Sequence, residues 1–364
     1  MAKIKVDILT LDISLGGGIE RVVSNMAWMF SDYGKQYEVR IVSAFKGHDN
    51  LRFPIPDSVP IVYLSDDKYD LTSLWKKIVS NFKLLRSIRK YQSDAVIIST
   101  TTNVTQWLSI LGKTRNQRII AAEHGYYWAF GSFSRFMRKH TYRKVNAVVT
   151  LTQSEKKNYE SFVKKVVNIP NSLSFYPEEP NTHNSKRVIA AGRAVIEKGF
   201  DQLLDIFKSL GRKYPDWTFD LFSGEGYLLG QLQEQVKNAS SNVHLLPASK
   251  NLKQEFLNGE LYVCSSYTES FSMTILEAAA CGMCVVSYDC PPGPREIITN
   301  EENGLIVPLN DKVALEETIE ELMNDSKRRI TLGEKARQNI KKYLPSNIFV
   351  MWEKLIGEVI SEQL

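Results

Sequence analysis

Two features are scarce or absent in this sequence, and each excludes a class of protein. No apolar run among the 364 residues is long enough to cross a bilayer, and residues 4–9 look like a first strand rather than a signal peptide. We therefore expect a cytoplasmic protein. Cysteine occurs only four times. Cys264 and Cys284 fall in buried strand patterns, and Cys281 with Cys284 lacks a second ligand pair, so we expect no metal site.

Internal repeats and a complete dinucleotide-binding fingerprint are also lacking. Gly16, Gly17 and Gly18 lie between the first strand pattern and the first helical pattern, but Arg21 stands where G-x-G-x-x-G requires its last glycine. What is present is typical of a soluble globular protein, with 43% apolar and 24% charged residues. The length exceeds what one core usually organises, and predicts two domains.

The charge is divided unevenly along the chain. Residues 1–171 contain 26 Lys and Arg against 14 Asp and Glu, a net charge of +12, whereas residues 172–364 contain 20 against 27, a net charge of −7. A basic half of this kind suggests an anionic partner, which at this point is a lipid headgroup, a phosphorylated acceptor or nucleic acid.

Both halves alternate apolar strand patterns with helical patterns, which predicts a doubly wound α/β fold in each. The segment from Phe175 to Ser185, with two prolines and several polar residues, reads as a linker. We place one Rossmann-like domain over residues 1–171 and a second over residues 172–345, followed by a last helix over residues 346–364.

The chain is organised around Glu269 and Glu277, which lie eight residues apart across a helix start. Ser270 is expected as the N-cap, Met273 to Ala280 as the helix, and Gly282 as its end. Free N–H groups of the first turn suit a phosphate, and the flanking carboxylates suit hydroxyl-rich rings, which is the layout of a nucleotide-diphosphate sugar. The alternative is a surface glutamate and an incidental loop acid.

Three further residues are expected at carboxyl ends of strands. His124 ends the pattern Ala121-Ala122-Glu123, and either a structural or a site role is open to it. Arg193 and Lys198 follow the strand at residues 188–191, where two cations can reach a diphosphate or simply face solvent.

Taken together, these features resemble the retaining glycosyltransferases of family 4, which have the GT-B architecture. The matching motifs occur in family order over nearly the whole chain: Gly17-Gly18-x-Glu20-Arg21-Val22, Glu123-His124, Pro170-Asn171, Gly192-Arg193 with Lys198-Gly199, Gly224-x-Gly226, Glu269 with Glu277, and Gly293-x-x-Glu296 before Gly304-Leu305. One departure is Pro291-Pro292-Gly293-Pro294, which replaces the more usual Gly-Gly run before Glu296.

The resemblance implies two Rossmann-like domains facing a cleft, the first binding the acceptor and the second the donor, with the last helix crossing back onto the first. It also implies residue roles. Arg193, Lys198, Glu269 and His124 are the catalytic set, of which the cations neutralise the diphosphate and Glu269 binds sugar hydroxyls. Glu277 is implied for the ribose. The remaining donor-binding residues are Gly17, Gly18, Gly192, Gly224, Phe271, Ser272, Met273 and Glu296.

The resulting hypothesis is a metal-independent transferase with no cofactor. It moves a hexose or N-acetylhexosamine from a nucleotide-diphosphate sugar, in the first place a UDP-sugar, to a lipid-linked or surface polysaccharide acceptor. A GT-B sugar-nucleotide epimerase, a phosphorylase and a non-catalytic nucleotide-sugar-binding protein are the alternatives. Nucleic acid is not expected, because no recognised motif accompanies the basic half.

An anionic membrane surface is the last expected partner, at the inner face of the cell membrane. Leu74, Trp75, Ile78, Phe82 and Leu85 recur at helical spacing in residues 72–90, which also carry six basic residues and no acid. Residues 132–144 add Phe133, Phe136 and Tyr142 beside Arg135, Arg138, Lys139, Arg143 and Lys144. The alternative, which we favour for the apolar stripe taken alone, is that the stripe packs on the domain core.

Overall fold

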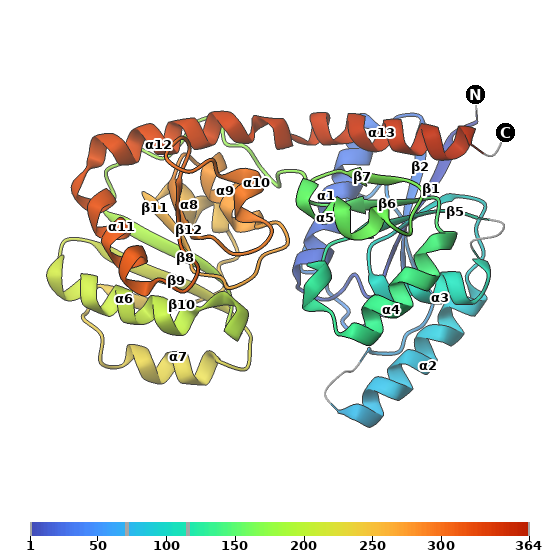
Figure 1. The fold of residues 1–364 in the computed structure, drawn as a ribbon, viewed down its shortest axis with the longest axis horizontal. Coiled ribbons are helices and arrows are strands. Elements are labelled where there is room, and N and C mark those ends of the chain that lie inside the picture. Colours follow the sequence, from blue (N-terminus) through green and yellow to red (C-terminus); the bar gives the residue numbers. More distant parts are fainter. Residues whose placement is uncertain (1, 70–72, 114–116, 363–364) are drawn as a thin grey trace. The chain divides into compact units, whose positions relative to one another are not determined.

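The structure is a computed structural model that describes residues 2–69, 73–113 and 117–362. The chain divides into two compact units, residues 1–172 together with 345–364, and residues 173–344. Each unit has its own parallel sheet with helices packed against it (Figure 1).

In the described part of the first unit, seven parallel strands pair in the order β3-β2-β1-β4-β5-β6-β7. The strands are β1 (Ile4–Thr10), β2 (Tyr37–Ser43), β3 (Ile61–Tyr63), β4 (Val96–Ser99), β5 (Arg118–Glu123), β6 (Ala147–Thr150) and β7 (Val166–Asn168). The order reverses between β1 and β4, and ligands of such sheets bind beyond the carboxyl ends of the strands at this point. The loops after β1 and β4 are therefore the ones that the fold presents to a ligand.

The helices of the first unit are α1 (Gly18–Tyr33), α2 (Leu74–Lys90), α3 (Thr102–Ile110), α4 (Ser132–Thr141), α5 (Gln153–Glu160) and α13 (Pro345–Ser361). One face of the sheet is covered by a cluster that contains Leu84 and Ile88 of α2, Val104 and Leu108 of α3, and Tyr159 of α5. On α1, Phe30 packs edge-on against Phe349 of α13, which holds the last helix to this unit.

The second unit is described throughout and has a six-stranded parallel sheet in the order β10-β9-β8-β11-β12-β13. Its strands are β8 (Arg187–Arg193), β9 (Thr218–Gly224), β10 (Val243–Pro247), β11 (Leu261–Cys264), β12 (Cys284–Tyr288) and β13 (Leu305–Val307). Here the order reverses between β8 and β11. The loops that carry Arg193, Lys198 and Glu269 follow these two strands, so the fold brings them to one edge.

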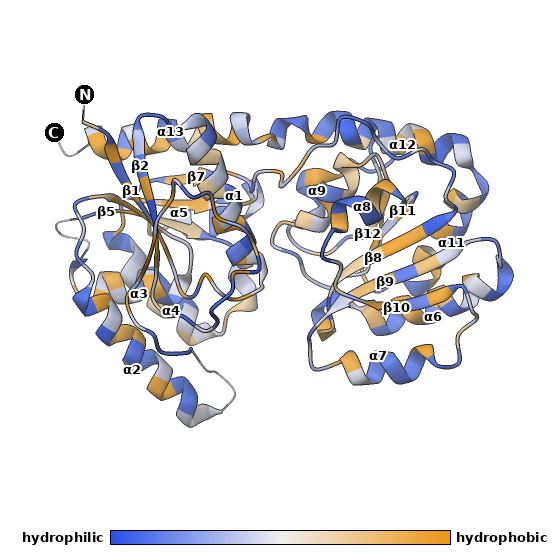
Figure 2. Cartoon of the chain, turned by 180° about the vertical axis from the view of Figure 1, so that it is seen from behind, coloured by the Kyte–Doolittle hydropathy of each residue, from blue (hydrophilic) through white to orange (hydrophobic). Residues whose placement is uncertain are grey.

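The helices of the second unit are α6 (Phe200–Lys213), α7 (Leu229–Val236), α8 (Leu252–Leu257), α9 (Met273–Ala280), α10 (Pro294–Ile297), α11 (Lys312–Asn324) and α12 (Ser326–Asn339). Figure 2 shows the apolar residues concentrated on the central strands and the polar residues on the outer helices. This distribution is expected because helices cover both faces of a parallel sheet. Every residue of β11 and of β12 is accordingly buried.

The α/β alternation predicted from the sequence is confirmed, and the helix predicted from Met273 to Ala280 has those bounds. The short strands β3, β7 and β10 were not predicted, because three to five residues of apolar character carry little periodic signal. The segment from Phe175 to Ser185, predicted as a linker, follows the boundary between the two units, which falls after Ser172. Arg337 donates to the carbonyl oxygens of Pro177 and Glu178, and Asn181 donates to Gly259 O at 2.5 Å, so this segment packs on the second unit.

Candidate functional site

The donor-side candidates gather where β8 and β11 end. Arg193 is the last residue of β8 and is exposed, and Lys198 lies in the short turn that follows. A Cβ on Gly192 would come within 3.3 Å of the Lys198 stem, so the glycine leaves the space in which that stem lies. Both cations thus lie near the end of β8, Arg193 exposed to solvent and Lys198 half-buried with its stem beside Gly192.

Gly199 joins the turn after β8 to the loop after β11. Its φ of +62° is in the left-handed region, and a Cβ there would collide with the carbonyl oxygen of Ser265. The contact is reinforced by two hydrogen bonds: Ser265 Oγ donates to Lys198 O at 2.8 Å, and Tyr267 N donates to Glu197 O at 2.8 Å. Only glycine lets these two loops approach so closely.

This approach places Lys198 against Glu269. The Lys198 ammonium forms an ion pair with Glu269 Oε1, and Ser266 Oγ donates to the same oxygen at 2.9 Å. Burial acts to lower the pKa of Lys198, but the Glu269 carboxylate outweighs it and the pKa is raised above its usual value. Lys198 is therefore charged at neutral pH, and its charge is held by a carboxylate.

The backbone of Glu269 is held by the loop after β12. Glu269 N donates to Pro291 O at 3.1 Å, and Gly293 N donates to Glu269 O at 2.8 Å. A Cβ on Gly293 would lie 2.7 Å from Glu269 O, so this glycine permits the contact. The loop Pro291-Pro292-Gly293-Pro294, which replaces the more usual Gly-Gly run, therefore makes two backbone hydrogen bonds to Glu269.

Helix α9 begins next to Glu269, and one detail of its predicted start is wrong. The N-cap is Ser272 rather than Ser270, and the Ser272 side chain makes no capping hydrogen bond. Phe271 is buried and packs edge-on against Tyr343 at 5.5 Å between ring centroids, whereas Met273 is half-buried. A first turn without a side-chain cap presents N–H groups to an anion.

Glu277 lies inside α9 and is fully buried. The Ser174 hydroxyl donates to Glu277 Oε1 at 2.8 Å. Glu277 Oε1 is thus already engaged by a hydroxyl of the segment that follows the unit boundary. Gly282 has φ +86° just past the end of α9, as predicted for the residue that ends the helix.

Gly224 and Glu296 complete the donor-side candidates. Gly224 ends β9, and a Cβ there would meet only ordinary contacts, the nearest at 3.8 Å, so the fold does not itself require glycine at this position. Its neighbour Gly226 does have a steric role, because a Cβ there would collide with Ala194 O. Glu296 is half-buried in α10, and Tyr343 donates to its carbonyl oxygen at 2.6 Å.

In the first unit, the candidate residues lie beyond β1 and β5. Gly17 is the N-cap of α1, and its N–H donates to Glu20 Oε2 at 2.8 Å. A Cβ on Gly18 would meet nothing within 4 Å, so space is open next to this backbone. The strand β5 ends at Glu123, so His124 stands at the carboxyl edge as predicted.

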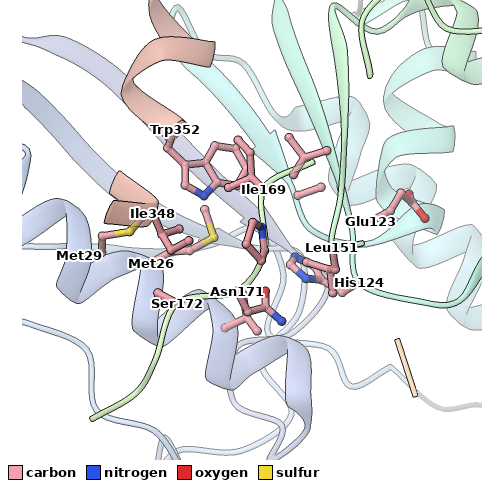
Figure 3. Close-up of a pocket in the computed structure, with 14 residues that line it drawn as sticks. Met26, Met29, Glu123, His124, Leu151, Ile169, Asn171, Ser172, Ile348 and Trp352 are labelled. Carbon is pink, nitrogen blue, oxygen red and sulfur yellow. The ribbon is translucent and has the colours of Figure 1, made fainter. Parts of the chain in front are cut away.

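His124 lines a small pocket that is partly open to solvent (Figure 3). The pocket is walled by apolar residues of α1 and α13, among them Met26 and Trp352, and Asn171 also lines it. Both ring nitrogens of His124 lack a hydrogen-bond partner among the described residues. Burial lowers the pKa of His124 to about 4, although the Glu123 carboxylate acts in the opposite direction. The imidazole is neutral at pH 7.

A buried polar cluster around Glu123 was not predicted from the sequence. Arg138 of α4 is fully buried, with Nη1 3.5 Å from Glu123 Oε2. Tyr142 donates to Glu123 Oε1, and Tyr159 donates to Glu123 Oε2 at 3.3 Å. Burial raises the pKa of both phenols well above the usual value, so both remain donors. The cluster fixes the residue directly before His124.

The earlier assignment of Arg138 to a basic surface is therefore wrong. Its guanidinium donates to Tyr159 at 2.8 Å and lies over the Phe130 ring at 4.3 Å from the centroid. The sequence gives no local signal of this burial, because the partners come from β5 and α5 while the neighbouring residue Lys139 is exposed.

Two family models match successive parts of the chain. Residues 16–174 match the model described as Glycosyltransferase Family 4, and residues 175–339 match the model described as Glycosyl transferases group 1. The two matches together extend over most of the chain.

Named relatives align over nearly the whole length. The GalNAc-alpha-(1->4)-GalNAc-alpha-(1->3)-diNAcBac-PP-undecaprenol alpha-1,4-N-acetyl-D-galactosaminyltransferase of Campylobacter jejuni is 26% identical, over 99% of this chain and 99% of the relative. The amylovoran biosynthesis glycosyltransferase AmsD of Erwinia amylovora is 24% identical, over 97% and 99%. The crystal structure of the pneumococcal O-GlcNAc transferase GtfA in complex with UDP and GlcNAc superposes with a TM-score of 0.79 at 14% identity, covering 99% of this chain and 100% of that chain.

Proposed function

Because the chain belongs to the family 4 glycosyltransferases and has their GT-B fold, we propose that it transfers a hexose or N-acetylhexosamine from a UDP-sugar, with retention, to a lipid-linked or polysaccharide acceptor. The observation that carries this proposal is the Lys198–Glu269 ion pair beside the exposed Arg193 and the uncapped start of α9. Cations, helix N–H groups and a carboxylate meet at one strand edge, as a sugar diphosphate requires.

The ion pair suggests how donor binding is coupled to sugar recognition. A bound diphosphate competes with Glu269 for the Lys198 ammonium, because the diphosphate as a whole carries more negative charge than a single carboxylate. Once Lys198 turns to the phosphate, Glu269 Oε1 loses one of its two partners and can accept a hydroxyl group of the sugar in that place. Ser266 still donates to Glu269 and keeps the carboxylate in place.

The same groups assist the reaction. Cleavage of the anomeric carbon–oxygen bond leaves the shared electron pair on the diphosphate, whose negative charge grows in the transition state. We propose that Lys198, Arg193 and the N–H groups of α9 stabilise that charge more than the charge of the bound donor, which would lower the barrier. We assign no enzyme nucleophile and no metal ion.

His124 is proposed to hydrogen-bond near the reacting sugar. With a pKa of about 4 it is neutral, so one ring nitrogen donates and the other accepts, and neither is occupied by a partner among the described residues. Glu123 and Arg138 hold the strand end from which His124 projects.

The two domains are proposed to have different roles. Residues 1–171 bind the acceptor and residues 172–345 bind the nucleotide sugar, with Glu277 and Glu296 contacting the donor.

The acceptor is proposed to be presented at the inner face of the cell membrane. The Campylobacter jejuni relative is named for an undecaprenol-linked acceptor, and the AmsD relative for biosynthesis of amylovoran. Among the described residues, no helix is both long and apolar enough to cross a bilayer. We propose peripheral attachment through the first unit, on the ground that residues 1–171 carry a net charge of +12.

The test combines ligand binding with product analysis. Thermal shift against UDP, GDP, ADP and their sugars should show stabilisation by UDP and its sugars, because a ligand that binds only the folded state raises its stability. The anomeric configuration of a product formed on a lipid-linked acceptor should then equal that of the donor. Inversion, or stabilisation by none of the nucleotides, would contradict the proposal. Donor turnover without an acceptor product would favour an epimerase, and turnover that needs inorganic phosphate would favour a phosphorylase.

A further inference from the structure

Helix α2 has two apolar faces, only one of which is used by the core. Leu84 and Ile88 are fully buried, whereas Trp75, Ile78 and Phe82 are 73%, 55% and 67% exposed. At 100° per residue these two groups lie on roughly opposite sides of the helix. The expectation that this stripe packs on the core is therefore wrong for these three residues. Leu85 of the same stripe is half-buried. The side chain of Leu74, and residue 72 as a whole, lie outside the described residues.

Helix α4 adds to the same kind of surface. Phe133 and Phe136 are 78% and 56% exposed. Both α2 and α4 pack on the short helix α3, so α3 is the element that lies between them. Figures 1 and 2 show the first turns of α2 projecting from the rest of the unit. We define the docking surface as the exposed side chains of α2 and α4 together with Arg143 and Lys144. Tyr142, which the sequence grouped with this surface, is fully buried and does not belong to it.

The charge of the docking surface has one sign. No acidic residue occurs in α2, in α4 or in the turn Tyr142–Lys144. Two basic side chains do not count: Arg138 is buried on Glu123, and Lys83 pairs with Asp67 at 2.7 Å. The basic residues that remain exposed are Lys76, Lys77, Arg86, Arg89, Lys90, Lys139, Arg143 and Lys144.

We infer that the docking surface binds an anionic lipid bilayer, with Trp75, Ile78 and Phe82 entering the headgroup region. This deepens the proposed function and rests on its lipid-linked acceptor. Exposed aromatic and aliphatic side chains flanked by Lys and Arg are what a helix lying in an anionic interface needs. A second copy of the same surface is disfavoured, because it would bring like charges together.

Apolar insertion and charge attraction make separate predictions for vesicle binding. Each basic residue near an anionic surface contributes about fivefold to binding, so reversing both Arg86 and Arg89 to Glu should weaken binding by at least about 25-fold. Changing Trp75 and Phe82 to Ser should also weaken binding, while the remaining binding keeps its dependence on salt. The matched controls lie in the second unit: Lys327→Glu with Lys335→Glu for charge, and Val313→Ser, at a site 65% exposed, for the apolar change.

The experiment is co-sedimentation of the full chain with phosphatidylcholine vesicles, with and without phosphatidylglycerol, at low and high salt. Binding should require the anionic lipid and fall at high salt, the docking-surface variants should lose it, and the control variants should keep it. The fluorescence difference between the wild type and Trp75→Phe should shift to shorter wavelength when anionic vesicles are added, because only Trp75 differs between the two chains.

Three outcomes would overturn the inference. The first is equal binding to neutral and anionic vesicles, and the second is no binding to anionic vesicles. The third is self-association or RNA binding that is lost in the Trp75 and Phe82 variant while the vesicle binding of that variant is unchanged. The thermal shift caused by UDP is measured on every variant. If it is retained while vesicle binding is absent, the docking surface fails and the proposed transferase stands; if it is absent in the wild type as well, the proposed function fails independently.

Discussion

In the proposed donor site, Lys198 and Glu269 form an ion pair with each other. Each neutralises the charge of the other at the strand edge, which limits the cost of keeping a partly buried ammonium there. At the residue scale the consequences are testable one side chain at a time.

Lys198→Ala and Arg193→Ala should each lower kcat by on the order of 10²–10³, because each removes a charge that faces the leaving group. Folding should change far less, because Ser266 still donates to Glu269 in the Lys198 variant. Turnover and melting temperature are measured on the same preparations, with Lys327→Ala as a control at an exposed lysine of the same unit. Wild-type turnover in either variant would remove that residue from the catalytic set.

Glu269 and Glu277 should differ in which part of the donor they sense. Glu269→Ala should weaken binding of the UDP-sugar and leave binding of UDP nearly unchanged, since this carboxylate is proposed to contact the sugar. Glu277→Ala should weaken both ligands, since it is proposed to contact the ribose. Calorimetry with the two ligands decides the matter, and equal losses in the two variants would refute the assignment.

His124 should make the protein less stable in acid. Its folded pKa of about 4 lies below the unfolded value of 6.5, so the unfolded chain binds the proton more readily and stability falls as the pH drops from 6.5 towards 4. The loss attributable to this residue reaches up to about 3 kcal/mol at the acid end. Urea unfolding of the wild type and His124→Gln at several pH values measures it, and parallel pH curves for the two chains would contradict the lowered pKa.

At the scale of elements, α4 carries different chemistry on its two sides. Phe133 and Phe136 face solvent, while Arg138 faces inward to Glu123, the residue before His124. The helix thus joins the proposed docking surface to the strand end that carries a proposed site residue. The inner side is the one on which stability depends.

Arg138→Met should destabilise the chain by about 3–5 kcal/mol, because it leaves the Glu123 carboxylate buried without its counter-charge. Adding Glu123→Gln should recover much of that loss, since the amide needs no cation. Thermal unfolding of the two variants provides the comparison. The neighbouring change Lys139→Met, at an exposed position of the same helix, should have little effect. A single variant as stable as the wild type would show that the pair contributes nothing.

At the scale of the whole molecule, the neutralisation of the donor is assigned to the protein alone. No two aspartates of the sequence lie two residues apart, whereas metal-dependent glycosyltransferases commonly use a D-x-D pair. Arg193 and Lys198 are proposed to supply the charge instead. Full activity is therefore expected in excess EDTA. Activity that disappears in EDTA and returns with Mg²⁺ or Mn²⁺ would contradict this expectation.

The sequence by itself determined the fold class and the position of the site along the chain. Apolar strand patterns alternating with helices allow little other than parallel α/β sheets, and parallel strands place their carboxyl ends at one edge. For that reason Arg193, Lys198 and Glu269 could be assigned to a common edge of the second unit, and His124 to the edge of the first.

Only the tertiary structure decided which charges meet and which side chains stay exposed. Lys198 pairs with Glu269 because Gly199 lets two loops touch, and Arg138 is buried because β5 and α5 supply its partners. Helical spacing identified two apolar faces on α2 but could not tell which one the core would cover. Pairing and burial depend on residues distant in the sequence, whereas periodicity records only neighbours within a few turns.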